Sequence, residues 1–433
     1  MNLRKRLTII LTIILLLLVN VPTYAKEFSI DAGAGILVEQ STGRVLYEKN
    51  ASLVKFPASC TKILTCICVL ENVNLNETAT VSKNALDSVP NGYVTCNLQI
   101  GEELPVLDLL YALMVKSAND AAVVLAEHVS GSVEEFSNLM NQKAKEIGCK
   151  NTHFVNPNGI HNENHYTTAY DLYKMADYAL TFEHADTFKQ LVSTTSYTLP
   201  KTNKYPSEDR IFQSTNELII VNNNDRPDNY YYKDALGIKT GHTSQAGYCV
   251  VSSATRDNLN LISVVLDGEI KDNGLSERYI DTIDLFNYGF ENFDKTKVIE
   301  AGDTVKTIEI DKATKKTKSL DVVIKDAIIA VNNKETNISD IKPKIIIDQN
   351  LEAPIEKNQE IGTITYTIDG VDYSSKLLAS HDVARFKITG YLIFFGILLL
   401  LWVLRSLRLR RIRRNRRRSR KRVAQSKQNR NLY

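Results

Sequence analysis

Acidic residues are absent from both ends of this 433-residue chain, because residues 1–25 and 405–433 contain no aspartate or glutamate. The two segments hold 3 and 14 of the 53 lysines and arginines, so 36 basic residues remain against 50 acidic ones. The nominal net charge of +3 therefore hides a charge of −14 over residues 26–404. So acidic a segment is a poor ligand for polyanions, which argues against a nucleic-acid-binding function for it.

The N-terminus has the pattern of a secretory signal. Arg4, Lys5 and Arg6 precede an uncharged run that begins at Leu7, and the small residue Ala25 follows this run. This order of a basic patch, an apolar run and a small residue predicts export with cleavage after Ala25. The alternative is an uncleaved membrane anchor, and the domain that follows is exported in either case.

Charge is also missing from residues 388–404 (ITGYLIFFGILLLLWVL), a run of about the minimum length that spans a bilayer as a helix. The Arg-rich segment 405–433 follows it directly. Because basic residues beside a span mark its cytoplasmic side, we expect a single-pass cell-membrane protein with residues 26–387 outside and the tail in the cytoplasm. The basic stretch RSLRLRRIRRNRRRSRKR contains no aromatic residue, which favours attraction to anionic lipids over binding to RNA or DNA.

Cysteine is scarce, with 6 residues, and none stands in the arrangement with histidine that a thiol enzyme would need. Exported proteins can form disulfides, so pairing of these residues stays open. However, four of the six lie in apolar helical or strand patterns, and a chain of this length does not need disulfides to be stable. We therefore expect mostly free, buried thiols, with Cys60 as a small core residue.

The pattern of apolar residues predicts an α+β domain. Residues 26–387 exceed the usual size of one domain, so two are expected. Alternation around residues 41–43 indicates a hairpin, and helical spacing then dominates over about 59–191. Strand patterns return over 234–268, and 278–293 again has helical spacing. This order requires a sheet in which the first hairpin pairs with strands from the far end of the domain.

After about residue 294 the pattern changes to short β-rich runs with polar turns. We therefore divide the exported part into a catalytic domain over 26–294, a small all-β domain over 295–377 and a linker over 378–387. The second domain is expected to serve as a pedestal that sets the height of the catalytic domain above the membrane. Direct binding of cell wall or of partner proteins by this domain is the alternative.

The spacing Ser-x-x-Lys occurs three times, beginning at Ser52, Ser59 and Ser339, and it is a weak signal alone. The local sequence selects Ser59, which follows a proline and begins an apolar helical pattern. Residues three apart are neighbours on a helix, so the Ser59 hydroxyl and the Lys62 amine can converge at the start of this helix. A desolvated lysine can take the proton of a serine and make it a nucleophile.

Two more short motifs follow in the chain. Ser117-Ala118-Asn119 lies between two apolar helical patterns, and Lys239-Thr240-Gly241 enters a strand. Ser-x-x-Lys, Ser-x-Asn and Lys-Thr-Gly in this order are the signature of active-site serine β-lactamases and penicillin-binding proteins. Three motifs that are weak alone become a strong indication when their order and context agree.

The chain resembles the serine-type D-alanyl-D-alanine carboxypeptidases, low-molecular-mass penicillin-binding proteins, over about residues 34–290. The strings that carry the resemblance are TGRVLYEKNA, PASCTK, SANDAA, FVNPNGIHNENHYTTAYDL, STNELI, GIKTGHTSQAGYCVVSSA and NYGF. Two departures, Cys60 for the usual leucine and Ala118 for a frequent glycine, remove no functional group. The resemblance implies a β-lactamase/transpeptidase-like domain, a mainly antiparallel sheet flanked by helices, and then the all-β domain. The spanning helix replaces the amphipathic surface helix of many members.

The resemblance also implies an activity, the removal of the terminal D-alanine from peptidoglycan stem peptides through an acyl-enzyme on Ser59. β-Lactam antibiotics would then be covalent inhibitors, and no cofactor is expected. Lys62 would act as the base of acylation, Ser117 would pass a proton to the leaving amine, and Asn119 would position the substrate and the lysine. The substrate-binding residues that the resemblance implies are Lys239, Thr240, Gly241, His242 and Arg278.

Two of these assignments are more specific. The backbone N–H groups of Ser59 and His242 would form the oxyanion hole, so the His242 ring need not take part in catalysis. Arg278 is aligned only through its distance from the NYGF string, and it would be a second contact for the substrate carboxylate.

Other functions fit the sequence less well. A β-lactamase needs a deacylating carboxylate, in one large class within Glu-x-x-Leu-Asn, and no such string lies between Ser117 and Lys239. A non-catalytic wall-binding scaffold on the same fold should have lost a polar group, and none is missing. His161 and His165 have the spacing of a zinc helix, but Asn162 replaces the needed glutamate, so we expect no metal.

Overall fold

The computed structural model describes residues 28–221, 229–387 and 389–430, so the predicted signal segment lies outside the described residues. The chain divides into two compact units, the first extending to Thr296 and including Val331–Thr336. The second unit contains Lys297–Ala330 and the residues from Asn337 onward.

The centre of the first unit is a five-stranded antiparallel sheet with the order β2-β1-β9-β8-β7. Its strands are β1 (Ala34–Glu39), β2 (Arg44–Lys49), β7 (Ala235–Thr243), β8 (Gly247–Arg256) and β9 (Leu259–Gly268). The β1–β2 hairpin pairs with β9, so that Ile36 lies opposite Val264. This confirms the prediction that the first hairpin joins strands from the far end of the domain. In this sheet β7 is an edge strand.

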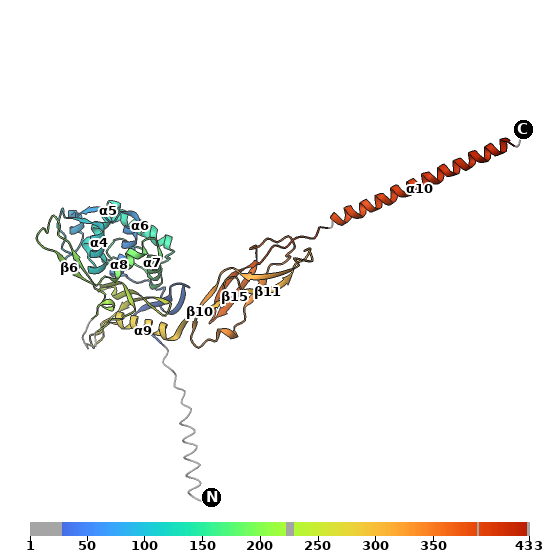
Figure 1. The fold of residues 1–433 in the computed structure, drawn as a ribbon. Coiled ribbons are helices and arrows are strands. Elements are labelled where there is room, and N and C mark those ends of the chain that lie inside the picture. The colour runs from blue at the N-terminus through green and yellow to red at the C-terminus, as the bar shows by residue number, and fades with distance from the viewer. Residues whose placement is uncertain (1–27, 222–228, 388, 431–433) are drawn as a thin grey trace, which may run out of the picture. The chain divides into compact units, whose positions relative to one another are not determined.

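Helices cover both faces of the sheet (Figure 1). The helices of the first unit are α2 (Lys62–Asn72), α3 (Lys83–Asp87), α4 (Val106–Tyr111), α5 (Asn119–Ser130), α6 (Val133–Ile147), α7 (Ala169–Thr181), α8 (Ala185–Ser193) and α9 (Glu277–Asn292). Successive residues of a strand point to opposite faces. Accordingly, Ile36 and Val38 of β1 belong to the core cluster that contains α2 and α7 residues, whereas Leu37 belongs to the cluster that contains Phe286 of α9.

Short elements complete the first unit and place the site residues. They are a 3-10 turn η1 (Ala58–Thr61), a π-helical turn η2 (Ala112–Lys116), a 3-10 turn η3 (Glu217–Ile219), and the strand pairs β3 (Thr78–Thr80) with β4 (Glu103–Pro105) and β5 (Ser196–Leu199) with β6 (Arg210–Gln213). Helix α2 is buried from Lys62 to Leu70, so the helix that follows the candidate nucleophile runs through the middle of the core. All six cysteines are free, and all except the partly exposed Cys149 are buried.

The second unit is β-rich, as predicted. Its strands and those at the boundary are β10 (Phe293–Ile299), β11 (Thr304–Glu309), β12 (Ser319–Ile324), β13 (Ile328–Asn333), β14 (Lys344–Ile347), β15 (Glu360–Ile368) and β16 (Val371–Ala379). Five of them form a sheet with the order β11-β12-β16-β15-β14, and its core includes Leu320, Ile364 and Leu377. Val383 lies in the range 378–387 that was expected to be a linker, but it pairs with Ile355. The β-rich unit therefore extends past β16 into this range.

The chain ends in a long helix, α10 (Thr389–Arg430). Among the described residues it is the one helix that is long and apolar enough to cross a membrane, which is consistent with a membrane anchor. The helix continues without a break from the apolar run into the Arg-rich segment.

Candidate active site

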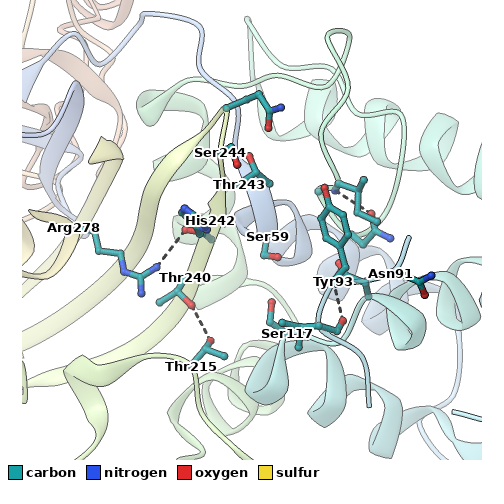
Figure 2. A pocket seen from close by; sticks show the side chains of 18 residues that line it. Ser59, Asn91, Tyr93, Ser117, Thr215, Thr240, His242, Thr243, Ser244 and Arg278 are labelled. Carbon is teal, nitrogen blue, oxygen red and sulfur yellow. Dashed lines mark hydrogen bonds between the residues drawn. The ribbon is translucent and has the colours of Figure 1, made fainter. Parts of the chain in front are cut away.

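A cavity of about 600 Å³ in the first unit brings the three motifs together (Figure 2). The predicted site residues that line it are Ser59, Ser117, Asn119, Thr240, Gly241, His242 and Arg278. Figure 2 shows Ser59 and Ser117 on facing sides of the cavity. The two lysines lie behind this lining, since Lys62 is 0% and Lys239 is 1% exposed. The structure therefore places every predicted site residue in or directly behind one cavity.

Ser59 sits in a tightly packed turn. It is part of η1, and Ala58 before it has a φ of +47°, a region that residues other than glycine seldom adopt. Two glycines allow this turn to be packed so closely. A Cβ on Gly241 would lie 2.9 Å from the Ser59 nitrogen, and a Cβ on Gly159 would lie 1.9 Å from the Ala58 oxygen. The glycine of Lys-Thr-Gly thus makes room for the backbone of the candidate nucleophile.

The Lys62 amine is surrounded by oxygen atoms. Its Nζ lies 2.9 Å from Ser59 Oγ, 2.9 Å from Asn119 Oδ1 and 2.6 Å from the backbone oxygen of Asn158. This confirms that Ser59 and Lys62 converge at the start of the helix. Burial, and next the positive charge of Lys239, hold the pKa of Lys62 well below its ordinary value.

The Ser-x-Asn motif is shaped by an unusual helix ending. The π-helical turn η2 ends at Lys116, and Ser117 directly after it has a left-handed φ of +64°. Helix α5 begins two residues later, at Asn119. Such turns and strained residues are frequent at functional sites. The Asn119 side-chain N–H donates to the backbone oxygen of Val94 at 2.9 Å, which fixes its Oδ1 toward Lys62. One amide therefore connects Lys62 with the backbone of Val94, another residue that lines the cavity.

Lys239 of strand β7 and Arg278 of helix α9 form the cationic side of the cavity. Lys239 Nζ donates to the backbone oxygen of Thr240 at 3.0 Å, and Arg278 Nη1 lies 3.4 Å from the backbone oxygen of Gly241. Burial is the main cause that lowers the pKa of Lys239 to about 8, and Arg278 adds to the effect. The His242 ring stacks on Tyr248 with the ring centres 4.1 Å apart.

Several features of the cavity were not predicted from the sequence. Thr215 lines it and shares a hydrogen bond of 2.8 Å with Thr240, between their hydroxyl oxygens. Asn158 contributes a backbone oxygen, and Tyr93 forms part of the wall (Figure 2). Thr215 lies in STNELI, and Asn158 lies in the turn-forming NPNG. Both strings are part of the resemblance, but neither indicated what these two residues do in the site.

The remaining candidates have simpler roles. Cys60 is fully buried with its Sγ 3.7 Å from the Lys239 backbone oxygen, and burial raises the pKa of its thiol, as befits a core residue. His161 and His165 have different partners, Glu163 at 3.2 Å and Thr61 at 2.8 Å. Within the described ranges no group of three or more His, Cys, Asp or Glu side chains could hold a metal ion.

A buried Ser–Lys pair at a helix start, a Ser-x-Asn turn opposite it and a Lys-Thr-Gly edge strand define an active-site serine enzyme of the penicillin-binding class. Comparison with known families narrows this class. The family model described as D-alanyl-D-alanine carboxypeptidase matches residues 21–270, and the one described as Penicillin-binding protein 5, C-terminal domain, matches residues 293–385. The chain therefore belongs to the D-alanyl-D-alanine carboxypeptidase family, and it is a serine-type carboxypeptidase.

Individual relatives agree with this assignment. D-alanyl-D-alanine carboxypeptidase DacF of Bacillus subtilis is 32% identical over 88% of this chain and 95% of its own length. DacA of Haemophilus influenzae is 31% identical over 84% of this chain and 88% of its own length. The crystal structure of penicillin binding protein 5 from Haemophilus influenzae superposes with a TM-score of 0.66 at 29% identity, covering 83% of this chain and 100% of that chain.

Proposed function

We propose that Ser59 attacks the carbonyl between the two terminal D-alanines of a peptidoglycan stem peptide. The C–N bond breaks, D-alanine leaves, and water then hydrolyses the acyl-enzyme on Ser59. The observation that carries this proposal is the trio of oxygen neighbours around the Lys62 amine, Ser59 Oγ, Asn119 Oδ1 and Asn158 O.

Counting hydrogens shows why these neighbours suit a base. A neutral amine has two hydrogens and one lone pair. The amide oxygen of Asn119 and the backbone oxygen of Asn158 can only accept hydrogen bonds, so they take the two hydrogens of Lys62. The lone pair is then left for the hydroxyl hydrogen of Ser59. The lowered pKa of Lys62 favours the neutral form that this arrangement requires.

The leaving group receives its proton on the opposite side of the cavity. Ser117 faces Ser59 (Figure 2). The Ser117 hydroxyl can donate its hydrogen to the departing amine while it accepts a hydrogen from the Lys62 ammonium. Asn119 holds Lys62 in place and positions the substrate. In this way the proton removed from Ser59 returns to the product amine.

The C-terminal carboxylate of the substrate would bind at the cationic side formed by Lys239, Thr240 and Arg278, with Thr215 orienting the Thr240 hydroxyl. Strand β7 has a hydrogen-bonded neighbour on one side only in the described sheet, so an extended peptide can align with its other edge.

The N–H groups of Ser59 and His242 would stabilise the oxyanion. β-Lactams contain a reactive amide and a carboxylate, so they would acylate Ser59 in the same geometry.

The membrane arrangement is also part of the proposal. We place the catalytic unit outside the cell and the basic end of α10 in the cytoplasm, because basic residues beside a span favour the inner side. The β-rich unit between them would hold the active site at the height of the cell wall.

The test compares two serines that share the same local spacing. Full-length protein in detergent should release D-alanine from a pentapeptide ending in D-Ala-D-Ala, and Ser59→Ala should abolish release. Ser52→Ala is the matched control, since Ser52 also begins a Ser-x-x-Lys string and is exposed, and it should leave the rate unchanged. Labelled penicillin should add mass to the control but not to Ser59→Ala. Turnover by Ser59→Ala would disprove the assignment.

A further inference from the structure

A hydrogen-bond chain behind the cavity ends on the residue that precedes the nucleophile. The Thr61 hydroxyl donates to the Ala58 backbone oxygen at 2.8 Å, and Thr61 Oγ1 also lies 2.8 Å from His165 Nε2. Thr61 and His165 are 0% and 2% exposed, so water does not compete for these bonds. Neither side chain lines the cavity.

The direction of every bond in this chain is determined. The backbone N–H of Val155 donates to His165 Nδ1 at 3.2 Å, so Nδ1 carries no hydrogen. The proton of a neutral ring is then on Nε2, because the partner of one ring nitrogen sets the tautomer of the other. His165 Nε2–H therefore donates to Thr61, and the Thr61 hydroxyl passes its own hydrogen to Ala58. The ring remains neutral because burial, then the neighbouring His153, Lys62 and His161, lower the pKa of His165 to about 3.

The last bond of the chain acts on the Ser59 N–H. The Ala58 C=O and the Ser59 N–H belong to one planar peptide group and point in opposite directions. Anchoring the oxygen from behind thus fixes the direction of the N–H on the other side. A hydrogen bond to the C=O also polarises the peptide group and strengthens its N–H as a donor.

The anchor acts where the backbone most needs support. Ala58 has the left-handed φ of +47°, which a non-glycine residue keeps only when its surroundings hold it there. Gly159 packs so closely behind it that a Cβ there would overlap the Ala58 oxygen at 1.9 Å. The loop that carries Gly159 and His165 therefore supports the nucleophile turn by contact and by hydrogen bonding.

We propose that His165 is a positioning residue which, through Thr61 and the Ala58 oxygen, aims the Ser59 N–H into the cavity as an oxyanion donor. This inference rests on the proposed role of Ser59. It assigns a catalytic consequence to a histidine that touches neither the substrate nor the reacting atoms. Because the oxyanion forms only as the carbonyl is attacked, loss of the anchor should reduce acylation and kcat, and leave KM nearly unchanged.

The experiment uses the full-length protein and measures penicillin acylation by intact mass, D-alanine release and thermal stability. His165→Leu removes the donor, and Thr61→Val removes the hydroxyl at nearly the same shape. Each should slow acylation about tenfold to a hundredfold, since misplacing a catalytic group by about 1 Å can cost about a hundredfold. The double variant should be no slower than either single variant, because both break the same chain. His165→Gln keeps an N–H donor and should recover much of the rate.

Asn141→Leu is the matched control for stability. Asn141 fixes the same loop by two hydrogen bonds to the backbone of Phe154, both 2.8 Å long, and has no part in the chain to Ala58. It should lower the melting temperature without slowing acylation. The positioning role is overturned if His165→Leu acylates at the wild-type rate, or if Asn141→Leu loses as much acylation rate as His165→Leu. It is also overturned if the losses of the two single variants add in the double variant. Penicillin attached to a residue other than Ser59 would instead overturn the proposed function.

Discussion

The backbone oxygen of Asn158 lies 2.6 Å from the amine nitrogen of Lys62. A backbone carbonyl cannot supply or take a proton and cannot be removed by changing a side chain, so it acts as a permanent orienting acceptor. The turn that presents it is fixed by the Asn158 side chain, whose Oδ1 accepts the N–H of Ile160 at 3.1 Å. The second acceptor of the amine, Asn119, is a side chain and can be changed. The orientation and charge of Lys62 can therefore be tested at Asn119.

Asn119→Asp should shift the acid limb of the pH–activity profile to higher pH. A carboxylate beside Lys62 favours its charged form and raises the pKa that burial and Lys239 had lowered. The neutral base is then populated only at higher pH. Each pH unit by which the acid limb moves lowers the neutral fraction of Lys62 by about tenfold. We therefore expect acylation at pH 7 to fall by about tenfold or more. Asn76→Asp, an exposed position, is the control and should leave the profile unchanged. An unshifted acid limb in Asn119→Asp would contradict Lys62 as the base.

Activity should also fall on the alkaline side, because Lys239 must be charged to bind a carboxylate. Its pKa is lowered to about 8, so the charge is present below this pH and is lost above it. kcat/KM should decline above pH 8, and kcat at higher pH, since bound carboxylate stabilises the charged lysine. A substrate with a C-terminal carboxamide gives the internal control: its lower activity should show no such decline. A decline of equal size for the carboxamide would assign the alkaline limb to another group.

Substitution by alanine should have very different effects at two neighbouring residues of β7. His242→Ala keeps the backbone N–H proposed for the oxyanion hole, and its ring packs on Tyr248, so most activity should remain. Gly241→Ala places a Cβ 2.9 Å from the Ser59 nitrogen and 3.0 Å from the Pro57 oxygen, both rigid backbone atoms. Displacing that turn should reduce penicillin acylation by about a hundredfold or more, the usual cost of losing an oxyanion donor. If His242→Ala lost as much as Gly241→Ala, the ring itself would take part in the reaction.

The sequence was most informative where regular structure relates residue spacing to position. Helical periodicity placed Ser59 beside Lys62, and the order of strands and helices required β1 to pair with β9. The first rule needs only three or four residues of context, because a helix repeats its geometry within one turn. The second rule needs the order of elements over the whole domain. The arrangement of the three motifs around one cavity followed from their known association rather than from spacing.

The contacts that could not be predicted join loops to distant elements. Thr61 and His165 are 104 positions apart and meet only because the loop after α6 folds back onto η1. The acceptor that Asn158 supplies is a backbone oxygen, which every residue type has, so no letter of the sequence indicates it. The left-handed Ser117 at the end of η2 likewise depends on packing, since serine has no preference for this conformation.

Protease accessibility tests the membrane arrangement. Protease added outside intact protoplasts should remove the catalytic and β-rich units and leave the basic end of α10 protected, because basic residues beside a span remain on the cytoplasmic side. A tag after residue 433 should stay on a short fragment. Permeabilised protoplasts, in which the tag should be degraded, provide the control. Loss of the tag from intact protoplasts would reverse the proposed orientation.

The pedestal role of the β-rich unit requires a test that leaves both units intact. Deleting residues 295–377 would also remove Val331–Thr336, which belong to the first unit, and Val331 is fully buried in its core. We therefore suggest inserting about 20 Gly/Ser residues after residue 387, which adds a flexible tether with a span of about 25 Å. Hydrolysis of a soluble pentapeptide should not change, because the active site is untouched. Trimming of intact wall in cells should fall, because the site is no longer held at one height. Normal trimming by a correctly inserted variant would contradict the pedestal and favour direct binding of the wall by the β-rich unit.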